Sequence, residues 1–268
     1  MLKDITLGQY YQTRSSLHSL DPRTKLIGVL IYLISLFLFN RIGAYVVALI
    51  FLAYVIKTSR VPFSFMIKGM KSIVFLLFIT VIFNLFLTAG NVVFVIWKFS
   101  ITDQGIRVAV FTVIRLTFLI IGASVLTLTT TPNNLTDGME DLMKPLGVFK
   151  VPVHEIAMMM SIALRFIPIL MEETDKIMKA QQARGADFEH GGPIKRAKSL
   201  VPILVPLFVS AFRRANDLAM AMEARCYRGG EGRTKMKPLK YKKADYIAYI
   251  ILAVYVAAII FAGRFAPI

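Results

Sequence analysis

Apolar residues along this chain gather into five runs that are nearly free of charge. The runs cover residues 24–39, 43–56, 70–89, 106–130 and 244–262. Because a helix rises about 1.5 Å per residue, a hydrocarbon core about 30 Å thick needs about 20 residues. The last three runs are that long, and the polar break Asn40-Arg41 followed by Gly43 favours a tight hairpin between the first two. The pattern therefore predicts five transmembrane helices.

A second pattern fills residues 153–184 and 194–225, where apolar residues recur at steps of three and four. This spacing predicts two long amphipathic helices. Both segments are apolar in the middle and carry charges in their second halves, so neither reads as a clean membrane span. Pro168, Pro202 and Pro206 would each remove a backbone hydrogen bond and bend the helix there.

Composition and charge place both patterns in a membrane protein. The chain is 56% hydrophobic with 32 Lys and Arg against 16 Asp and Glu, and its mean hydropathy is +0.64. A polytopic membrane protein with basic cytoplasmic loops combines these properties, whereas a soluble domain does not. The segment 144–243 carries more than half of the Lys and Arg, while the opposite side holds only Arg41, Lys98 and Arg264. This distribution predicts a cytoplasmic N-terminus, an outside C-terminus and, because the opening residues are polar, no cleavable signal peptide.

The expected architecture is an all-α polytopic membrane protein with about five transmembrane helices. Residues 1–130 form a transmembrane domain of four spans, and residues 244–268 form the final span. Between them, residues 131–243 form a cytoplasmic coupling domain of long amphipathic helices.

Both amphipathic segments end on the same step, an alanine, an arginine and a small residue. The two copies are Ala183-Arg184-Gly185 and Ala224-Arg225-Cys226. One interpretation is local, because a cation near a helix C-terminus complements the helix dipole and Gly185 can end the helix in a left-handed conformation. The other is docking, because a guanidinium makes two parallel hydrogen bonds to a carboxylate or carbonyl groove. Repetition of the step within one cytoplasmic insert favours docking.

Other candidate chemistry is sparse. A phosphate-binding P-loop ends in Gly-Lys-Ser or Gly-Lys-Thr, and the dipeptide Gly-Lys occurs nowhere in the sequence. The three histidines are scattered, and the acidic residues Asp137, Glu140 and Asp141 have no matching His. The single Cys226 allows no internal disulfide. We therefore expect neither catalysis nor a bound cofactor or metal in this chain.

Two further features each allow a structural and a functional interpretation. Arg115 is the one cation well inside a predicted span. It could belong to a transport path or make a structural bond, for example to a carbonyl or to Asn84, and we favour the bond. Before the first span, Asp21-Pro22-Arg23 reads as a turn, with Arg23 and Lys25 anchoring the span at lipid phosphates. A self-contained carrier or channel stays the alternative function, although the spans offer few polar groups to line a path.

Five motifs give the chain a resemblance to a known family. They are HSLDPRTKL at 18–26, TLTTTP at 127–132, ALRFIP at 163–168, AQQARG at 180–185 and EARCYRGG at 223–230. The chain resembles the transmembrane T component of energy-coupling factor transporters, which are prokaryotic uptake systems of the cell membrane for vitamins and some metal ions. The resemblance implies a scaffold that joins a membrane-embedded, substrate-binding S component to two cytoplasmic ABC-type ATPases. Those ATPases would bind the ATP and magnesium.

The resemblance also assigns residues. It implies that Arg184 and Arg225 each sit in a groove of one ATPase subunit, and that the apolar middles of the two helices support the S component. For that surface we expect Met159, Met160, Leu164, Ile203, Leu207 and Phe208. Cys226 departs from the family pattern, which has Gly there. Cysteine is small enough to keep the docking, but its side chain disfavours a left-handed helix end.

Overall fold

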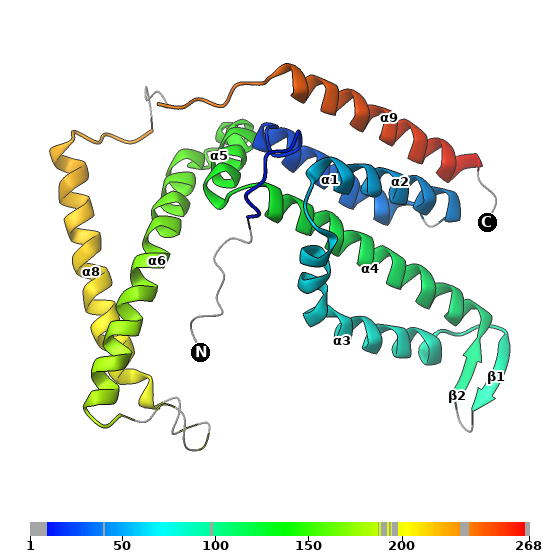
Figure 1. Ribbon diagram of the computed structural model, residues 1–268, viewed down its shortest axis with the longest axis horizontal. Helices are drawn as coiled ribbons and strands as arrows, with labels where there is room; N and C mark the ends of the chain where they lie inside the picture. The colour runs from blue at the N-terminus through cyan, green and yellow to red at the C-terminus, as the bar shows by residue number, and fades with distance from the viewer. Residues whose placement is uncertain are drawn as a thin grey trace. The chain divides into compact units, whose positions relative to one another are not determined.

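Helices make up most of the computed structural model, which describes residues 10–39, 41–96, 99–186, 188, 192, 194, 198–230 and 236–265 (Figure 1). The elements are α1 (Pro22–Leu38), α2 (Ile42–Ser59), α3 (Phe63–Leu87), β1 (Val92–Ile96), β2 (Phe99–Thr102), α4 (Asp103–Thr129), α5 (Pro132–Met143), the 3-10 helix η2 (Lys144–Phe149), α6 (Val153–Ala183), α8 (Val201–Ala224) and α9 (Lys243–Phe265).

The five apolar runs of the sequence correspond to α1, α2, α3, α4 and α9, which confirms the predicted fold class of an α-helical membrane protein. The helix α3 begins at Phe63, earlier than its apolar run, because the helix continues through the polar stretch around Lys68. A short antiparallel hairpin, β1 and β2, connects α3 to α4 and departs from the purely helical prediction. In this hairpin Val92 lies opposite Thr102.

Length and composition separate the helices that could cross a bilayer alone from the shorter ones. Within the described residues, α2, α4, α6 and α9 are long and apolar enough to do so. The helix α1 has 17 residues, and the apolar part of α3 is Ile73–Leu87. The helix α6 meets these criteria because the part before its charged second half is apolar. The sequence pattern had assigned α6 to an amphipathic cytoplasmic helix.

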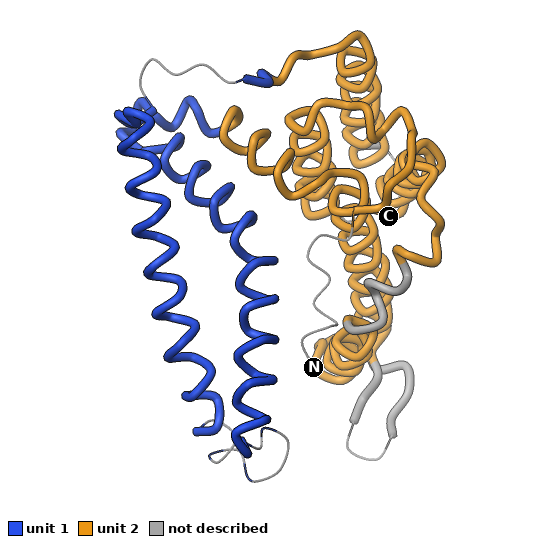
Figure 2. The backbone as a smooth tube through the Cα atoms, turned by 60° about the vertical axis from the view of Figure 1, so that its left-hand side comes forward, with its two compact units in different colours: residues 1–7, 143–238 blue, residues 8–142, 239–268 orange. Residues whose placement is uncertain are grey.

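The chain divides into two compact units, coloured orange and blue in Figure 2. One comprises residues 8–142 and 239–268 and holds the five apolar helices; the other comprises residues 143–238 and holds α6 and α8. The helix α5, which follows the expected boundary at residue 130, packs with the apolar helices of the first unit. A side chain at Gly138 would come within 2.9 Å of Pro22, and Asp141 pairs with Arg23 at 3.6 Å.

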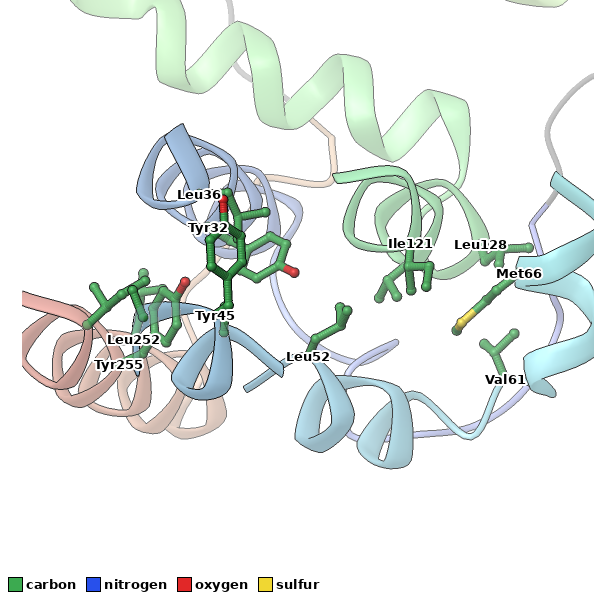
Figure 3. Close-up of a cluster of buried hydrophobic side chains, with 14 residues drawn as sticks. Tyr32, Leu36, Tyr45, Leu52, Val61, Met66, Ile121, Leu128, Leu252 and Tyr255 are labelled. Carbon is green, nitrogen blue, oxygen red and sulfur yellow. The ribbon is translucent and has the colours of Figure 1, made fainter. Parts of the chain in front are cut away.

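The core of the five-helix unit lies among α1, α2, α4 and α9 (Figure 3). Phe51 and Tyr255 stack with ring centroids 4.2 Å apart, and the Tyr255 hydroxyl lies 2.6 Å from the Ser35 hydroxyl. The helices α1 and α4 approach closely at Gly122, where a Cβ atom would lie 2.5 Å from the Tyr32 ring. Small residues at a crossing let membrane helices pack backbone to backbone, and many large apolar side chains of these helices face outward, as a lipid environment requires.

Candidate coupling helices and their arginine ends

The helices α6 and α8 form an antiparallel pair, visible side by side in blue in Figure 2. Glu173 of α6 accepts hydrogen bonds from the Ser210 hydroxyl at 3.0 Å and from the Arg214 guanidinium, which also forms an ion pair with it. These bonds, Arg214 first, lower the pKa of the Glu173 carboxyl. Nearer the end of α6, the Gln181 amide donates to the Pro202 carbonyl at 3.4 Å. Side chains thus fix the register of the two helices.

The antiparallel register places Arg184 and Arg225 at opposite ends of the pair. The segment after α8 returns to the start of α6, where a Cβ atom at Gly230 would lie 2.5 Å from the His154 ring. Arg225 is therefore level with the first turns of α6, roughly 26 residues from Arg184, and at about 1.5 Å per residue the two ends are roughly 40 Å apart. All six residues of the two Ala-Arg-small steps are exposed. The structure presents them as two separate sites.

Both arginine ends have the same backbone geometry. Each arginine is the C-cap residue of its helix. The residue after it has a left-handed backbone conformation, with φ of 89° at Gly185 and 56° at Cys226. In each copy two amides donate back across the turn, the pattern of a Schellman motif. The bonds are Gly185 to Gln182 (2.9 Å), Ala186 to Gln181 (3.0 Å), Cys226 to Glu223 (2.8 Å) and Tyr227 to Met222 (3.0 Å).

The left-handed Cys226 corrects an expectation from the sequence. The Cβ atom of cysteine disfavours this conformation by about 1 kcal/mol, but the two backbone hydrogen bonds of the motif hold the residue in it. The second helix therefore ends as the first does, with its arginine at the same position of the cap.

Exchanging the small residues between the two copies should shift the stability of each helix end in opposite directions. In Cys226→Gly the conformational strain is removed, so the Tyr227 amide should exchange with deuterium about fivefold more slowly. In Gly185→Cys the strain is introduced, so the Ala186 amide should exchange faster by a similar factor. Hydrogen exchange measured by mass spectrometry checks both, and equal rates in variant and wild type would show that neither cap carries strain.

The residues expected to contact an S component are only partly available, and the register separates them. Met159 and Phe208 are exposed, and Met160, Leu164 and Leu207 are half-buried, whereas Ile203 is 6% exposed and offers no surface to a partner. The three residues on α6 lie near the Arg225 end and the three on α8 near the Arg184 end, because the helices run in opposite directions. On α8 the exposed apolar stripe consists of Val201, Leu204, Val205, Phe208, Val209 and Phe212.

Arg115 makes the structural bond that we favoured. Its Nε atom donates to the Tyr45 hydroxyl at 3.1 Å, and its guanidinium carbon lies 5.7 Å from the centre of the Phe37 ring. The partners come from α2 and α1, so this partly buried cation of α4 connects three helices.

A polar cluster at the start of α1 was missed by the sequence reasoning. Asp21 caps α1 by accepting from the Arg23 amide at 2.9 Å, and its carboxylate also binds the Arg23 guanidinium. The Lys25 ammonium donates to the carbonyls of His18 (3.2 Å) and Thr129 (3.0 Å). Lys25 is only 8% exposed, so the expectation that it anchors the span at lipid phosphates is wrong.

The acceptor at the centre of this cluster is Asp245, in the first turn of α9. Its side chain is fully buried and accepts from the Asp21 amide at 2.8 Å and from the Lys242 amide at 2.7 Å. An aspartate at a helix start is common in any sequence, so nothing in the local pattern around Asp245 indicated a partner 224 residues away. The cluster joins α1 to α9, and through Lys25 to the end of α4.

Among the described residues, no three His, Cys, Asp or Glu side chains gather as they would around a metal ion. The features of the described chain are those of a multi-pass helical membrane protein with two exposed arginine ends. Both ends are exposed and share one helix-cap geometry.

Comparison with known proteins gives the family. The family model described as CbiQ, cobalt transport protein, matches residues 13–236. The energy-coupling factor transporter transmembrane protein EcfT of Clostridium kluyveri is 55% identical over 258 residues, 96% of each chain. The EcfT proteins of Ruminiclostridium cellulolyticum and Bacillus subtilis are 53% and 47% identical, over 97% of this chain and 97% and 99% of their own lengths. This chain belongs to the EcfT family of energy-coupling factor transporter transmembrane proteins, as its motifs indicated.

Proposed function

We propose that the chain couples ATP binding and hydrolysis in two cytoplasmic ABC-type ATPases to the movement of a membrane-embedded S component, for uptake of a vitamin or another micronutrient. The observation that carries this proposal is the pair of equally capped arginines, Arg184 and Arg225, at opposite ends of one antiparallel helix pair. Two matched attachment points roughly 40 Å apart suit two similar partners, one at each end. ATP and magnesium belong to those partners, and this chain is a non-catalytic subunit.

The proposed orientation follows the positive-inside rule. The N-terminus and the unit of residues 143–238 lie in the cytoplasm, where most Lys and Arg are, and the C-terminus lies outside. In this orientation α6 and α8 can carry motion of the ATPases to the membrane surface. The exposed apolar stripe of α8 then offers the S component a surface that holds it without directional hydrogen bonds and lets it tilt.

In this mechanism α6 and α8 must stay in contact with each other while they transmit force. The bonds of Glu173 with Ser210 and Arg214 supply a polar contact in the middle of the pair, and apolar side chains such as Phe166 and Leu218 line the space beside it. When the ATPases approach or separate, each arginine end moves with its own ATPase. Because the contact of Glu173 with Ser210 and Arg214 holds the helices together at their middle, these two movements change the angle between α6 and α8.

Coexpression of the chain with its two ATPases tests the proposal. Without any S component, the chain should copurify with both ATPases, and the purified complex should bind no radiolabelled vitamin. Adding an S component should restore vitamin binding and ATP-dependent uptake into vesicles. High-affinity vitamin binding by this chain alone would overturn the proposal in favour of a self-contained carrier.

A further inference from the structure

A cavity of about 410 Å³ lies within the five-helix unit, between α1, α2, α4 and α9. Its walls are mainly apolar and include Val29, Phe51, Leu126 and Ile251, together with Tyr32 and Leu52, which Figure 3 labels in the adjoining core. Protein interiors are close-packed, and binding sites for small ligands start at about 300 Å³. A cavity of this size in the five-helix unit is therefore large enough to bind a ligand, and its mainly apolar walls favour an apolar ligand.

Most of the polar groups of the cavity lie at one end. Ser16, Thr24, Lys25, Thr58 and Thr129 lie where α1 begins and where α2 and α4 end. The Lys25 ammonium is already bound to the carbonyls of His18 and Thr129. Farther along the helices the wall is apolar except for the tyrosines Tyr54 and Tyr32, and the Tyr32 hydroxyl is bound to the Phe118 carbonyl. Helix ends of transmembrane segments lie at the membrane surface. The cavity thus has its polar end at the surface and its apolar end toward the middle of the bilayer, which is the polarity of a phospholipid in the adjoining leaflet.

One polar group in the wall is left without a hydrogen bond inside the protein. Thr24 is 4% exposed, and its buried hydroxyl has no hydrogen-bond partner in the described part of the chain. A buried hydroxyl without a partner is destabilising, and buried polar groups in native structures are nearly always paired with protein, water or ligand. The Thr24 hydroxyl can donate a hydrogen bond to a carbonyl oxygen that enters the cavity.

Gly28, one turn farther along α1, lines the cavity and leaves space that no other described part of the protein fills. A Cβ atom at Gly28 would meet nothing within 4 Å, in contrast to Gly122, where it would press on Tyr32. Glycine in the middle of a helix is unfavourable relative to alanine, so a glycine without a close neighbour needs a reason other than packing inside the chain. Space along α1 for an apolar chain is such a reason.

We propose that this cavity binds one acyl chain of a bilayer phospholipid. The ester carbonyl accepts a hydrogen bond from Thr24, and the chain runs past Gly28 toward Tyr32 and Leu252. The bilayer supplies acyl chains in great excess, and the few polar groups of the wall suit one ester better than a polar metabolite. The site does not depend on the proposed coupling function; only the identity of the leaflet follows from the proposed orientation.

Photolabelling tests this site directly. The full chain is reconstituted in vesicles of phosphatidylethanolamine and phosphatidylglycerol that contain a phosphatidylglycerol with a diazirine on one acyl chain. After illumination, mass spectrometry should find label on cavity residues such as Val29 and Ile251, at a higher yield than on the outward-facing Phe75 and Phe78 of α3. A cavity yield equal to or below that of α3 would overturn the proposal, as would labelling by a diazirine fatty acid but not by the phospholipid.

Two variants with matched controls sharpen the test. Gly28→Leu fills the cavity and should reduce the cavity yield to the level of α3, whereas Gly28→Ala leaves space and should keep most of it. Thr24→Val keeps the shape but removes the donor, so it should weaken lipid retention about fivefold, the effect of one hydrogen bond. In lipid-free detergent the same Thr24→Val change should raise the unfolding temperature, because an unpaired buried hydroxyl is gone. Unchanged labelling in a folded Gly28→Leu variant would show that the lipid binds elsewhere.

Discussion

The double variant Arg184→Glu, Arg225→Glu should lose both ATPases and all ATP-driven uptake. Each substitution places a carboxylate where a guanidinium is expected to fill an acceptor groove, so attraction becomes repulsion. Loss of one partner of a buried, hydrogen-bonded charge pair costs about 2–5 kcal/mol, and reversal of the charge costs more. Copurification through an affinity tag on this chain measures assembly, and vitamin uptake into vesicles measures function.

The single variants should show smaller effects, because the two arginines lie at opposite ends of the α6–α8 pair. Arg184→Glu should weaken one ATPase contact and leave the contact at Arg225 in place, and the reverse holds for Arg225→Glu. Within one complex, each remaining contact keeps the weakened one at a high effective concentration. The double variant should therefore lose more bound ATPase than the sum of the two single losses.

The matched control reverses two charges on the same helices away from their ends. Arg165 of α6 and Arg213 of α8 are also exposed, and both lie in the middle of the pair. Arg165→Glu with Arg213→Glu should leave both ATPases bound. If the end variant instead retains both ATPases and normal uptake, the arginines are helix caps and nothing more.

The existence of the apolar helices and of the amphipathic helices α6 and α8 could be predicted because both depend on local patterns. Long apolar runs gave α1, α2, α3, α4 and α9, and the three- and four-residue steps gave α6 and α8. The packing of α5 against α1 could not be predicted, because the ion pair of Asp141 with Arg23 and the close approach of Gly138 to Pro22 leave no periodic trace in the sequence.

The relation between the coupling helices could not be predicted for a different reason. Amphipathic spacing shows which face of a helix is apolar but not which way a neighbour runs along it. The antiparallel register depends on Glu173, Ser210 and Arg214, which are ordinary surface residues when each helix is read alone. The left-handed Cys226 was unexpected because residue preference weighed against it, and the hydrogen bonds of the whole motif outweighed that preference.

Replacement of Asp245 by Ala should be the most destabilising single change in the five-helix unit. The substitution leaves the amides of Asp21 and Lys242 without their acceptor and removes the carboxylate that attracts the buried Lys25 ammonium. One buried and one partly buried donor without an acceptor, together with a less compensated buried charge, should cost about 3 kcal/mol or more. Thermal unfolding in detergent should then shift down by roughly 10 °C, by the scaling for chains of about this size.

Two control variants separate this network from a general effect of an acidic residue at a helix start. Asp103 also lies in the first turn of a span, α4, but it is exposed, so Asp103→Ala should cost only the helix-dipole contribution of about 0.3–1 kcal/mol. Asp245→Asn keeps one carbonyl acceptor and loses the charge, so it should unfold between wild type and Asp245→Ala. If Asp245→Ala unfolds at the same temperature as Asp103→Ala, the buried carboxylate does not hold α9 to α1, and the contacts of Tyr255 with Ser35 and Tyr32 must do so instead.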